Sequence, residues 1–343
     1  MPAHLWVRAE TRANERRVGL MPEGAAALMS VGVQVTVEEA PHRIVRTDAY
    51  AAAGCAIAAA GSWTDAPRDA VIFGLKELPE GTAPLHHAHV MFGHAFKGQP
   101  GAAAFLARFR AGGGALYDLE YLVSETGRRV AAFGHWAGYA GAALSLLAWG
   151  ALPGRLPPVG VFADAAVMAE AVRAAGAPNP SVIIIGAKGR VGGGAAALCR
   201  AVGVAPTEWD MAETSHGGPF REVLAHNVFL NCILAAPGVP VFVPREATSM
   251  DRSLRVVGDI ACDPGSDYNP VPIYDRVTTW AAPTRRVAEA PSLDVMAIDN
   301  LPSLLPAEAS TDFAAQLLPH LQSIGRLDAG VWGRARATFE AHA

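Results

Sequence analysis

Short apolar runs alternate with helix-like segments along the first third of the chain. An apolar run of this length bounded by turn residues predicts a buried strand, and a longer run with apolar residues every three or four positions predicts a helix. Strands are expected at residues 5–10, 33–40, 71–77, 89–96 and 114–122, with helices at 22–32, 47–54 and about 99–111. This alternation predicts a doubly wound, mainly parallel sheet.

The alternation resumes after a long segment rich in Gly and Ala, residues 133–152, which predicts a helix with small residues for close packing. Residues 181–203 predict a strand, a glycine turn and a helix in succession. Further strands are expected at 205–210, 227–234 and 254–261, and a helical segment at 302–343. The pattern therefore predicts two α/β domains joined near residue 134.

Composition is that of a globular protein with a large core. The 343 residues are 51% hydrophobic and 17% charged, with a net charge of −4 and no basic tract that would follow a nucleic-acid backbone. No apolar stretch is long enough for a signal peptide or a membrane span. The cysteines, Cys55, Cys199, Cys232 and Cys262, lack C-x-x-C spacing, so we expect reduced thiols in a cytoplasmic protein.

The segment VIIIGAKGRVGGG carries a glycine motif typical of dinucleotide sites. Gly186, Gly189 and Gly192 would permit a tight turn and a close approach of backbone amides to a pyrophosphate at the start of the next helix. Asp210 ends the following strand, where a carboxylate can bind the ribose hydroxyls and repel a 2′-phosphate. NAD is therefore favoured over NADP. The alternative is a glycine turn that only packs a helix against a sheet.

Two expected strands of the first domain end in polar groups. Lys76 and Glu77 follow the run VIFGL, and His94 follows VMFG, as though two parallel strands ended at one height. Ligands of open α/β sheets bind at this end. The plain alternatives are a strand end emerging into solvent for Lys76 and a core histidine for His94. Arginines that could bind carboxylates lie nearby in sequence at positions 8, 12, 16, 17, 128 and 129.

The tract LHHAH, residues 85–89, contains three histidines but has no carboxylate or cysteine partner at metal-ligand spacing. We expect a polar loop and no metal site. No G-x-S-x-G element or other nucleophile motif is present.

Together these segments resemble the NAD-dependent, lysine-forming saccharopine dehydrogenases, relatives of alanine dehydrogenase and transhydrogenase. The resemblance rests on segments that follow one another in order: VRAETRANERRVGLMP, GLKELPE, FGHAFKGQ, LYDLEYL, GRRVAAFG, IIIGAKGRVGGGA, ETSHGGPF, NPVPIY and AIDNLPSLLPAEAS. It implies two Rossmann-like domains with the active site in the cleft between them. The substrate and catalytic domain would comprise residues 1–134 plus about 317–343, and the NAD-binding domain about 135–316.

The resemblance also implies roles for individual residues. Lys76 and His94 match catalytic acid–base groups, with Glu77 and Glu120 as acidic neighbours that tune them. Substrate contacts would come from Arg17, Lys76, Arg129, Phe133, Ala261, Cys262 and Asp263. Cofactor contacts would come from Arg128, Gly186, Gly189, Arg190, Gly192, Asp210, Thr214, Leu234, Ile260, Ile298, Asp299, Asn300 and Leu301.

The implied reaction is oxidation of saccharopine by NAD to an imine, which is hydrolysed to lysine and 2-oxoglutarate by a monomeric enzyme. One departure is Val191, which stands where fungal members have a cysteine able to pair with the one matching Cys232, so no disulfide is expected there. Two other functions remain open at this point: a dehydrogenase of another opine-like substrate, and a regulatory protein that binds NAD without catalysis.

Overall fold

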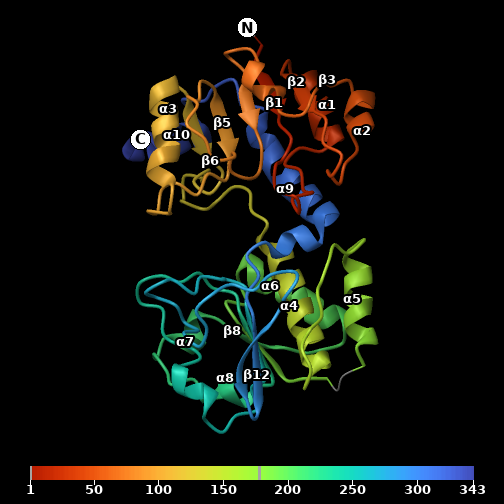
Figure 1. Ribbon diagram of the computed structural model, residues 1–343, viewed down its shortest axis with the longest axis vertical. Helices are drawn as coiled ribbons and strands as arrows, with labels where there is room; N and C mark the ends of the chain where they lie inside the picture. The colour runs from red at the N-terminus through yellow and green to blue at the C-terminus, as the bar shows by residue number, and fades with distance from the viewer. Residues whose placement is uncertain (1, 177–178) are drawn as a thin grey trace. The chain divides into compact units, whose positions relative to one another are not determined.

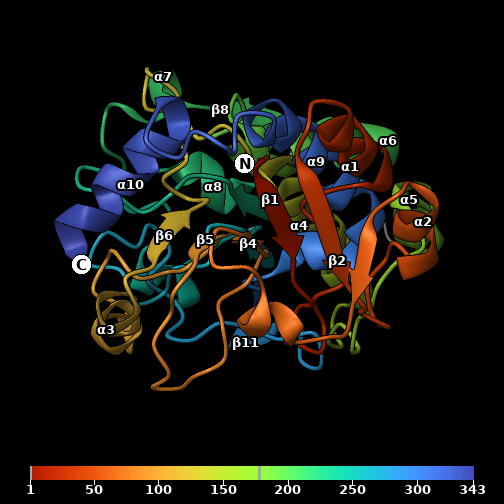
Figure 2. The same cartoon turned by 90° about the horizontal axis from the view of Figure 1, so that it is seen from above.

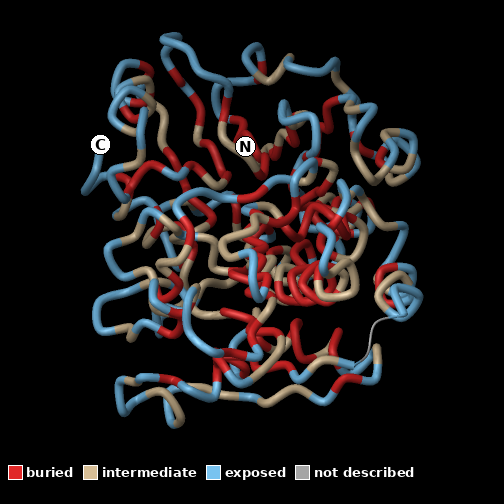
Figure 3. Tube along the Cα trace, turned by 60° about the horizontal axis from the view of Figure 1, so that its bottom comes forward, coloured by how far each residue is buried: buried red, intermediate tan, exposed pale blue. Residues whose placement is uncertain are grey.

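The computed structural model describes residues 2–176 and 179–343, which form two compact units. Unit 1 comprises Met1–Ala132 and Ala309–Ala343, and unit 2 comprises Phe133–Glu308. Each unit contains one six-stranded sheet. Buried residues concentrate along the strands, while the connecting loops are largely exposed, as the coloured trace shows (Figure 3). The structure therefore confirms an α/β fold with two mainly parallel sheets.

Unit 1 has a parallel sheet in the order β3-β2-β1-β4-β5-β6, whose strands lie side by side in Figure 2. Its elements are β1 (His4–Val7), α1 (Pro22–Ser30), β2 (Gln34–Glu38), α2 (Thr47–Ala52), β3 (Ala56–Ala58), the 3-10 helix η1 (Ser62–Asp65), β4 (Val71–Phe73), β5 (Ala88–Met91), α3 (Ala102–Gly112), β6 (Ala115–Asp118) and α10 (Gly330–His342). This is the strand order of a dinucleotide-binding fold, and its order reverses between β1 and β4.

Helices cover the unit 1 sheet with aromatic contacts. Helices α3 and α10 flank β5 and β6 (Figure 1), and the rings of Phe109 and Phe339 lie 5.6 Å apart between them. Tyr117 of β6 contacts Trp332 of α10 with ring centroids 6.2 Å apart. Strand β4 is buried at every residue, as expected for a parallel strand covered on both faces. The carboxy-terminal helix is therefore an integral part of this core.

Unit 2 has a sheet in the order β11-β12-β10-β9-β7-β8, in which only the described edge strand β11 is antiparallel. Its elements are α4 (Gly134–Ala151), α5 (Ala165–Ala174), β7 (Val182–Ile185), α6 (Arg190–Ala201), β8 (Thr207–Trp209), α7 (Met211–Thr214), α8 (Arg221–Ala225), β9 (Val228–Asn231), η2 (Arg245–Thr248), β10 (Val256–Asp259), β11 (Arg285–Glu289), β12 (Ser292–Met296) and η3 (Leu301–Leu304). Helix α9 (Pro306–Leu321) begins in unit 2 and continues into unit 1.

Helices α4 and α6 pack with almost no space between their backbones. A Cβ on Gly138 would lie 1.8 Å from the Val191 carbonyl oxygen, and one on Gly194 would lie 1.8 Å from the His135 carbonyl oxygen. The close packing expected from the small residues of 133–152 is thus confirmed.

Two sequence expectations need correction. The strand expected at 114–122 ends at Asp118, because the Asp118 carboxylate accepts the N–H of Glu120 and the chain turns there. The histidine tract is only in part the expected polar loop: His86 is exposed in a loop, whereas His87 and His89 are 5% and 0% exposed and His89 lies in β5. His89 packs edge-on against Trp63 and Phe109, and burial lowers its pKa to about 3.

Candidate functional site

The carboxyl ends of β4 and β5 bring Lys76 and His94 to one edge of the unit 1 sheet. The two strands are neighbours, with Phe73 opposite Val90. Their ladder continues past the strand ends: the N–H of Gly74 donates to Val90 at 3.0 Å, and that of Phe92 donates to Leu75 at 3.0 Å. Lys76 follows β4 by three residues and His94 follows β5 by three residues. The expectation of two strands ending at one height is therefore confirmed.

Glu77 forms an ion pair beside Lys76. The Nε of Arg12 donates to Oε1 of Glu77 at 2.8 Å, and Nη2 of Arg12 donates to the same oxygen. Burial favours a raised pKa for Glu77, but its backbone hydrogen bond and the charges of Arg12 and Lys76 outweigh burial and lower that pKa. The other oxygen, Oε2, is buried and has no hydrogen-bond partner within residues 2–176 and 179–343. This oxygen can accept a hydrogen bond from a ligand.

Glu120 connects two cations at the same edge. Its Oε1 accepts hydrogen bonds from Lys97 Nζ and Arg129 Nη2, each at 2.9 Å. Burial opposes ionisation, but Lys97, Arg129 and His94 together hold the pKa of Glu120 below its ordinary value. The sequence reasoning missed Lys97, although the segment FGHAFKGQ contains it next to His94.

His94 has an unusual backbone conformation. Its φ is 49°, in the left-handed region that non-glycine residues seldom adopt, and its side chain is exposed. The buried Asp118 holds the adjacent backbone by accepting the N–H of Gly93 at 3.1 Å, and it also accepts that of Glu120 at 2.8 Å. Burial raises the pKa of Asp118 despite these bonds. Strained residues that the surrounding structure holds in place concentrate at functional sites.

The arginines near the start of the chain differ in what they can bind. Arg17 is 5% exposed and donates from Nε and Nη2 to Glu15 at 2.8 and 2.6 Å. Burial would raise the pKa of Glu15, but Arg17 and the nearby charge of Lys76 lower it. Arg8 is 2% exposed and its guanidinium donates to the carbonyl oxygen of Lys76, so it binds the backbone of this loop.

In unit 2, the glycine turn lies where the strand order reverses, between β7 and β9. Gly186 has φ 87°, and a Cβ there would lie 2.5 Å from Ile233. A Cβ on Gly192 would lie 2.1 Å from the Gly186 carbonyl oxygen. Gly189 is the N-cap residue of α6, so the turn leads directly into the amino end of a helix. The turn therefore has the tight backbone that a pyrophosphate site requires.

Asp210 lies beside this turn. Its Oδ2 accepts the N–H of Lys188, in the turn, at 3.0 Å, and its Oδ1 accepts that of Met211 at 2.9 Å. Thr214 donates its hydroxyl to the Asp210 carbonyl oxygen at 3.0 Å. The carboxylate is thus fixed at the carboxyl end of β8, next to the glycines.

Most of the other residues expected to contact the cofactor or the substrate follow strand ends of the same sheet. Residues 260–263 follow β10, and 298–301 follow β12, the parallel neighbour of β10. Leu234 is 75% exposed, whereas Ile298 and Leu301 are each 1% exposed, so the latter two offer backbone groups rather than side chains. Cys262 adopts φ 54°, and Asp259 accepts its N–H at 3.3 Å. Ala261, Asp263, Asp299 and Asn300 lie in these two loops, with Asp263 and Asp299 exposed.

The remaining expected residues lie outside these strand-end loops. Arg190 is the first residue of α6 and is exposed. Arg128 is exposed on the turn before Arg129, and its carbonyl oxygen accepts the N–H of Ser124 at 2.8 Å. Phe133 is the N-cap residue of α4. All four cysteines are free thiols in the structure.

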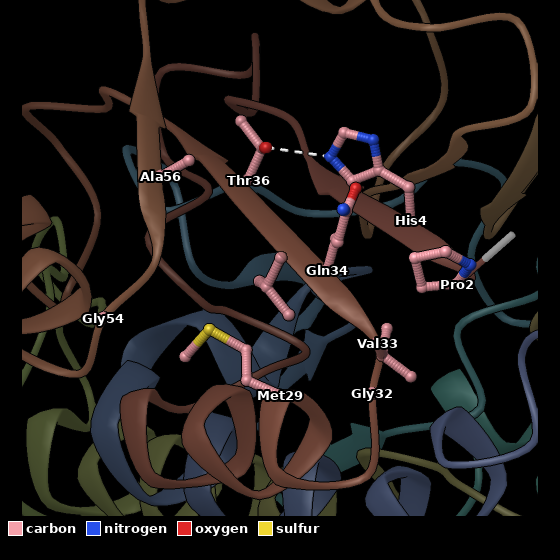
Figure 4. Close-up of a pocket in the computed structure, with 10 residues that line it drawn as sticks. Pro2, His4, Met29, Gly32, Val33, Gln34, Thr36, Gly54 and Ala56 are labelled. Carbon is pink, nitrogen blue, oxygen red and sulfur yellow. Dashed lines mark hydrogen bonds between the residues drawn. The ribbon is translucent and has the colours of Figure 1, made fainter.

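A hollow of about 470 Å³ lies elsewhere in unit 1, at the amino ends of β1 and β2 (Figure 4). His4, whose ring nitrogen lies 2.9 Å from the Thr36 hydroxyl, lines it together with Met29 and Gln34. It contains none of the residues expected at the site. Because ligands of open α/β sheets bind at the carboxyl ends of strands, we do not assign the site to this hollow.

Known proteins match along the chain. Residues 6–140 match the family model described as alanine dehydrogenase/PNT, N-terminal domain. The saccharopine dehydrogenase (NAD+, L-lysine-forming) of Neurospora crassa is 45% identical over 359 residues, covering 99% of this chain and 96% of its own length. The protein of the same name from Yarrowia lipolytica is 41% identical, covering 99% of this chain and 98% of its own length.

Two solved structures share the fold. A transhydrogenase from Sinorhizobium meliloti superposes with a TM-score of 0.66 at 18% identity, covering 95% of each chain. An L-alanine dehydrogenase superposes with a TM-score of 0.65 at 18% identity, covering 99% of this chain and 93% of its own. Among the described residues, every helix is too short or too polar to span a bilayer.

Proposed function

The chain belongs to the family of saccharopine dehydrogenases (NAD+, L-lysine-forming), and we propose that it converts saccharopine, NAD+ and water into L-lysine, 2-oxoglutarate, NADH and a proton. The observation that carries this proposal is the 45% identity to a relative of that name over 99% of the chain. The function is that of an NAD-dependent oxidoreductase acting on a CH–NH bond.

The residues of unit 2 fit NAD. The glycine turn is packed so closely that a Cβ on Gly192 would lie 2.1 Å from the Gly186 carbonyl oxygen, and Asp210 is fixed beside it. We propose that the backbone of Gly186, Gly189 and Gly192 holds the pyrophosphate and that Asp210 accepts hydrogen bonds from the ribose hydroxyls. When bound, NAD supplies the acceptor for the hydride that leaves the substrate carbon.

In unit 1, Lys76 is proposed as the base for the oxidation. The secondary ammonium of saccharopine must lose a proton before hydride can leave the adjacent carbon, because the nitrogen lone pair forms the imine bond. Lys76 Nζ would accept that proton. Glu77 lies close to this amine, since the charge of Lys76 contributes to the lowered pKa of Glu77. A carboxylate there favours the protonated form of the lysine and so opposes its role as base.

His94 is proposed to assist imine hydrolysis. Its imidazole would remove a proton from the attacking water and return one to the departing amine nitrogen. The charge cluster of Glu120, Lys97 and Arg129 is close enough to influence it, since His94 contributes to the lowered pKa of Glu120. Arg17 and Arg129 are proposed to bind substrate carboxylates, because a guanidinium can bind a carboxylate through two N–H groups.

The test is the absorbance of NADH with purified protein, lysine and 2-oxoglutarate. We expect NADH to be consumed with this set. We expect no reaction when pyruvate replaces 2-oxoglutarate or when NADPH replaces NADH. Consumption only with another oxo acid or amine would assign a related opine dehydrogenase. NADH binding without turnover on any oxo acid would instead identify a non-catalytic binding protein.

We also propose a cytoplasmic monomer. Four free thiols without a disulfide suit a reducing compartment. Light scattering at assay concentration should give the mass of one chain, and a mass of two chains would overturn the monomer.

A further inference from the structure

Arg8 and Glu10 form an ion pair just after β1, close to the end of the neighbouring strand β4. Arg8 and Glu10 follow Val7, the last residue of β1, and their side chains are 1% and 11% exposed, with Nη1 of Arg8 3.5 Å from Oε2 of Glu10. Strand β1 pairs with β4, the strand that leads to Lys76. The sheet order reverses between these two strands, so the pair lies at the switch point of unit 1.

The Glu10 carboxylate holds two consecutive amides of the Lys76 loop. Its Oε1 accepts the N–H of Leu75 at 2.6 Å, and its Oε2 accepts the N–H of Lys76 at 3.1 Å. A carboxylate that accepts two adjacent N–H groups fixes the orientation of the peptide between them. The backbone from which the Lys76 side chain departs is therefore held from the amide side.

Arg8 holds the same residue from the carbonyl side. Its Nη2 donates to the carbonyl oxygen of Lys76, and its Nη1 donates to the Ala9 carbonyl oxygen at 3.1 Å. Gly74 provides the space for this guanidinium, because a Cβ at Gly74 would lie 2.5 Å from Nε of Arg8. Both backbone polar groups of Lys76 thus bind side chains from the segment that follows β1.

We propose that Arg8 and Glu10 are positioning residues that place the Lys76 amine for proton transfer. This rests on the proposed function, in which Lys76 is the base. A displacement of about 1 Å at a reacting group can lower a rate by about 100-fold. Neither Arg8 nor Glu10 needs to contact the substrate, since each acts through the backbone of Lys76.

The experiment compares full-length Glu10→Ala, Glu10→Gln and Lys76→Met with the wild type. We expect Glu10→Ala to lower kcat by roughly 10- to 100-fold with little change in KM for NADH. Lys76→Met should remove one limb of the pH–rate profile, and Glu10→Ala should shift that limb along the pH axis. Glu10→Gln keeps one acceptor oxygen and should fall between Glu10→Ala and the wild type.

Asp294→Asn in unit 2 is the matched control, because it also disrupts a buried Arg–carboxylate pair. Asp294 is 0% exposed, and Arg286 Nε donates to it at 2.5 Å. Asp294→Asn should lower the midpoint of thermal unfolding without moving the pH–rate limb. If Glu10→Ala lowers thermal stability as the control does but leaves kcat and that limb unchanged, the positioning role is overturned.

A second measurement separates this proposal from the role of Lys76 itself. Lysine occurs three times in the chain, at positions 76, 97 and 188. A pulse of an amine-reactive succinimidyl ester followed by peptide mass spectrometry gives the modification rate of each. If Lys76→Met is active, Lys76 is not the base. A modification rate at Lys76 that Glu10→Ala changes, while the rate at Lys188 stays the same, still supports the positioning contact. An unchanged modification rate at Lys76 overturns it.

Discussion

The two sheets place different chemistry at their switch points. In unit 1 the order reverses between β1 and β4, and the chain there carries Arg8, Glu10 and Lys76. In unit 2 it reverses between β7 and β9, and the chain there carries the glycine turn. A reversal of strand order thus carries charged side chains in one unit and a glycine turn in the other. A shared fold gives the location of a site, while the residues after the strands give its chemistry.

The largest effect is expected from removing the charge at the unit 1 switch point. Lys76→Met should lower kcat by about 10²- to 10⁴-fold, because a positioned proton acceptor contributes that much. Steady-state rates across pH, with Arg336→Met as a control, measure it. Arg336 lies on α10, 49% exposed and paired with Glu340, so that variant should keep wild-type activity. A fully active Lys76→Met would show that Lys76 is not the base, and the contrast between charged side chains in unit 1 and a glycine turn in unit 2 would then not extend to the chemistry.

The corresponding change in unit 2 is Gly192→Ala, with Gly193→Ala as its control one residue along α6. A methyl at position 192 would lie 2.1 Å from a carbonyl oxygen, whereas one at position 193 meets nothing within 4 Å. We expect the dissociation constant of NADH to rise by at least ~10-fold for Gly192→Ala. Gly193→Ala should keep wild-type affinity and stabilise the helix by about 0.5–1 kcal/mol. Equal affinities in a fluorescence titration would argue that this turn only packs a helix.

A smaller effect concerns the choice of cofactor. Asp210→Asn removes the charge that opposes a 2′-phosphate but leaves an oxygen that can accept an N–H. We expect the preference for NADH over NADPH in kcat/KM to fall by roughly 10-fold, about 1.4 kcal/mol. Glu208→Gln, on β8 and paired with Arg200, is the control and should keep the wild-type ratio. An unchanged ratio for Asp210→Asn would mean that another group reads the ribose.

The last prediction concerns stability alone and sharpens the contrast between two histidines of one segment. His94 is exposed, but burial lowers the pKa of His89 to about 3, so the folded state keeps His89 neutral where the unfolded chain protonates it. The unfolded state then binds more protons, and stability falls as pH drops below 6.5. Between pH 6.5 and 4.5, His89 should account for a loss of roughly 2 kcal/mol.

His89→Phe keeps an aromatic ring against Trp63 and Phe109 and should remove that part of the acid dependence. Urea unfolding at several pH values measures it. Carboxylates contribute to the acid dependence of stability in both the wild type and His89→Phe. The quantity to compare is therefore the difference between their two curves of unfolding free energy against pH. Parallel curves for variant and wild type would show that His89 is protonated in the folded state.

Local patterns predicted the parts of the fold and site that depend on neighbours in sequence. The buried strands Val71–Phe73 and Val182–Ile185 and the glycine turn could all be found from short segments. Strand β12 (Ser292–Met296) was missed because its apolar run is interrupted by Asp294, which is buried against Arg286. That partner comes from a different strand, so no local pattern reveals it.

The supporting carboxylates could not be predicted for the same reason. Glu10 and Asp118 act by accepting N–H groups from loops of neighbouring strands. Those pairings follow from the order β1-β4-β5-β6, in which β1 and β4 are adjacent although two strands separate them in sequence. Sequence reasoning proposed the side chains that would react, but not those that hold the loops carrying them.

The discontinuity of unit 1 has a consequence for synthesis. Helix α10, whose Trp332 and Phe339 complete the aromatic packing of β6 and α3, leaves the ribosome after unit 2. Unit 2 is continuous in sequence, from Phe133 to Glu308, and has all its residues before unit 1 does. We therefore expect unit 2 to fold first, while the amino-terminal sheet waits, with part of its apolar surface uncovered, until α10 has been made.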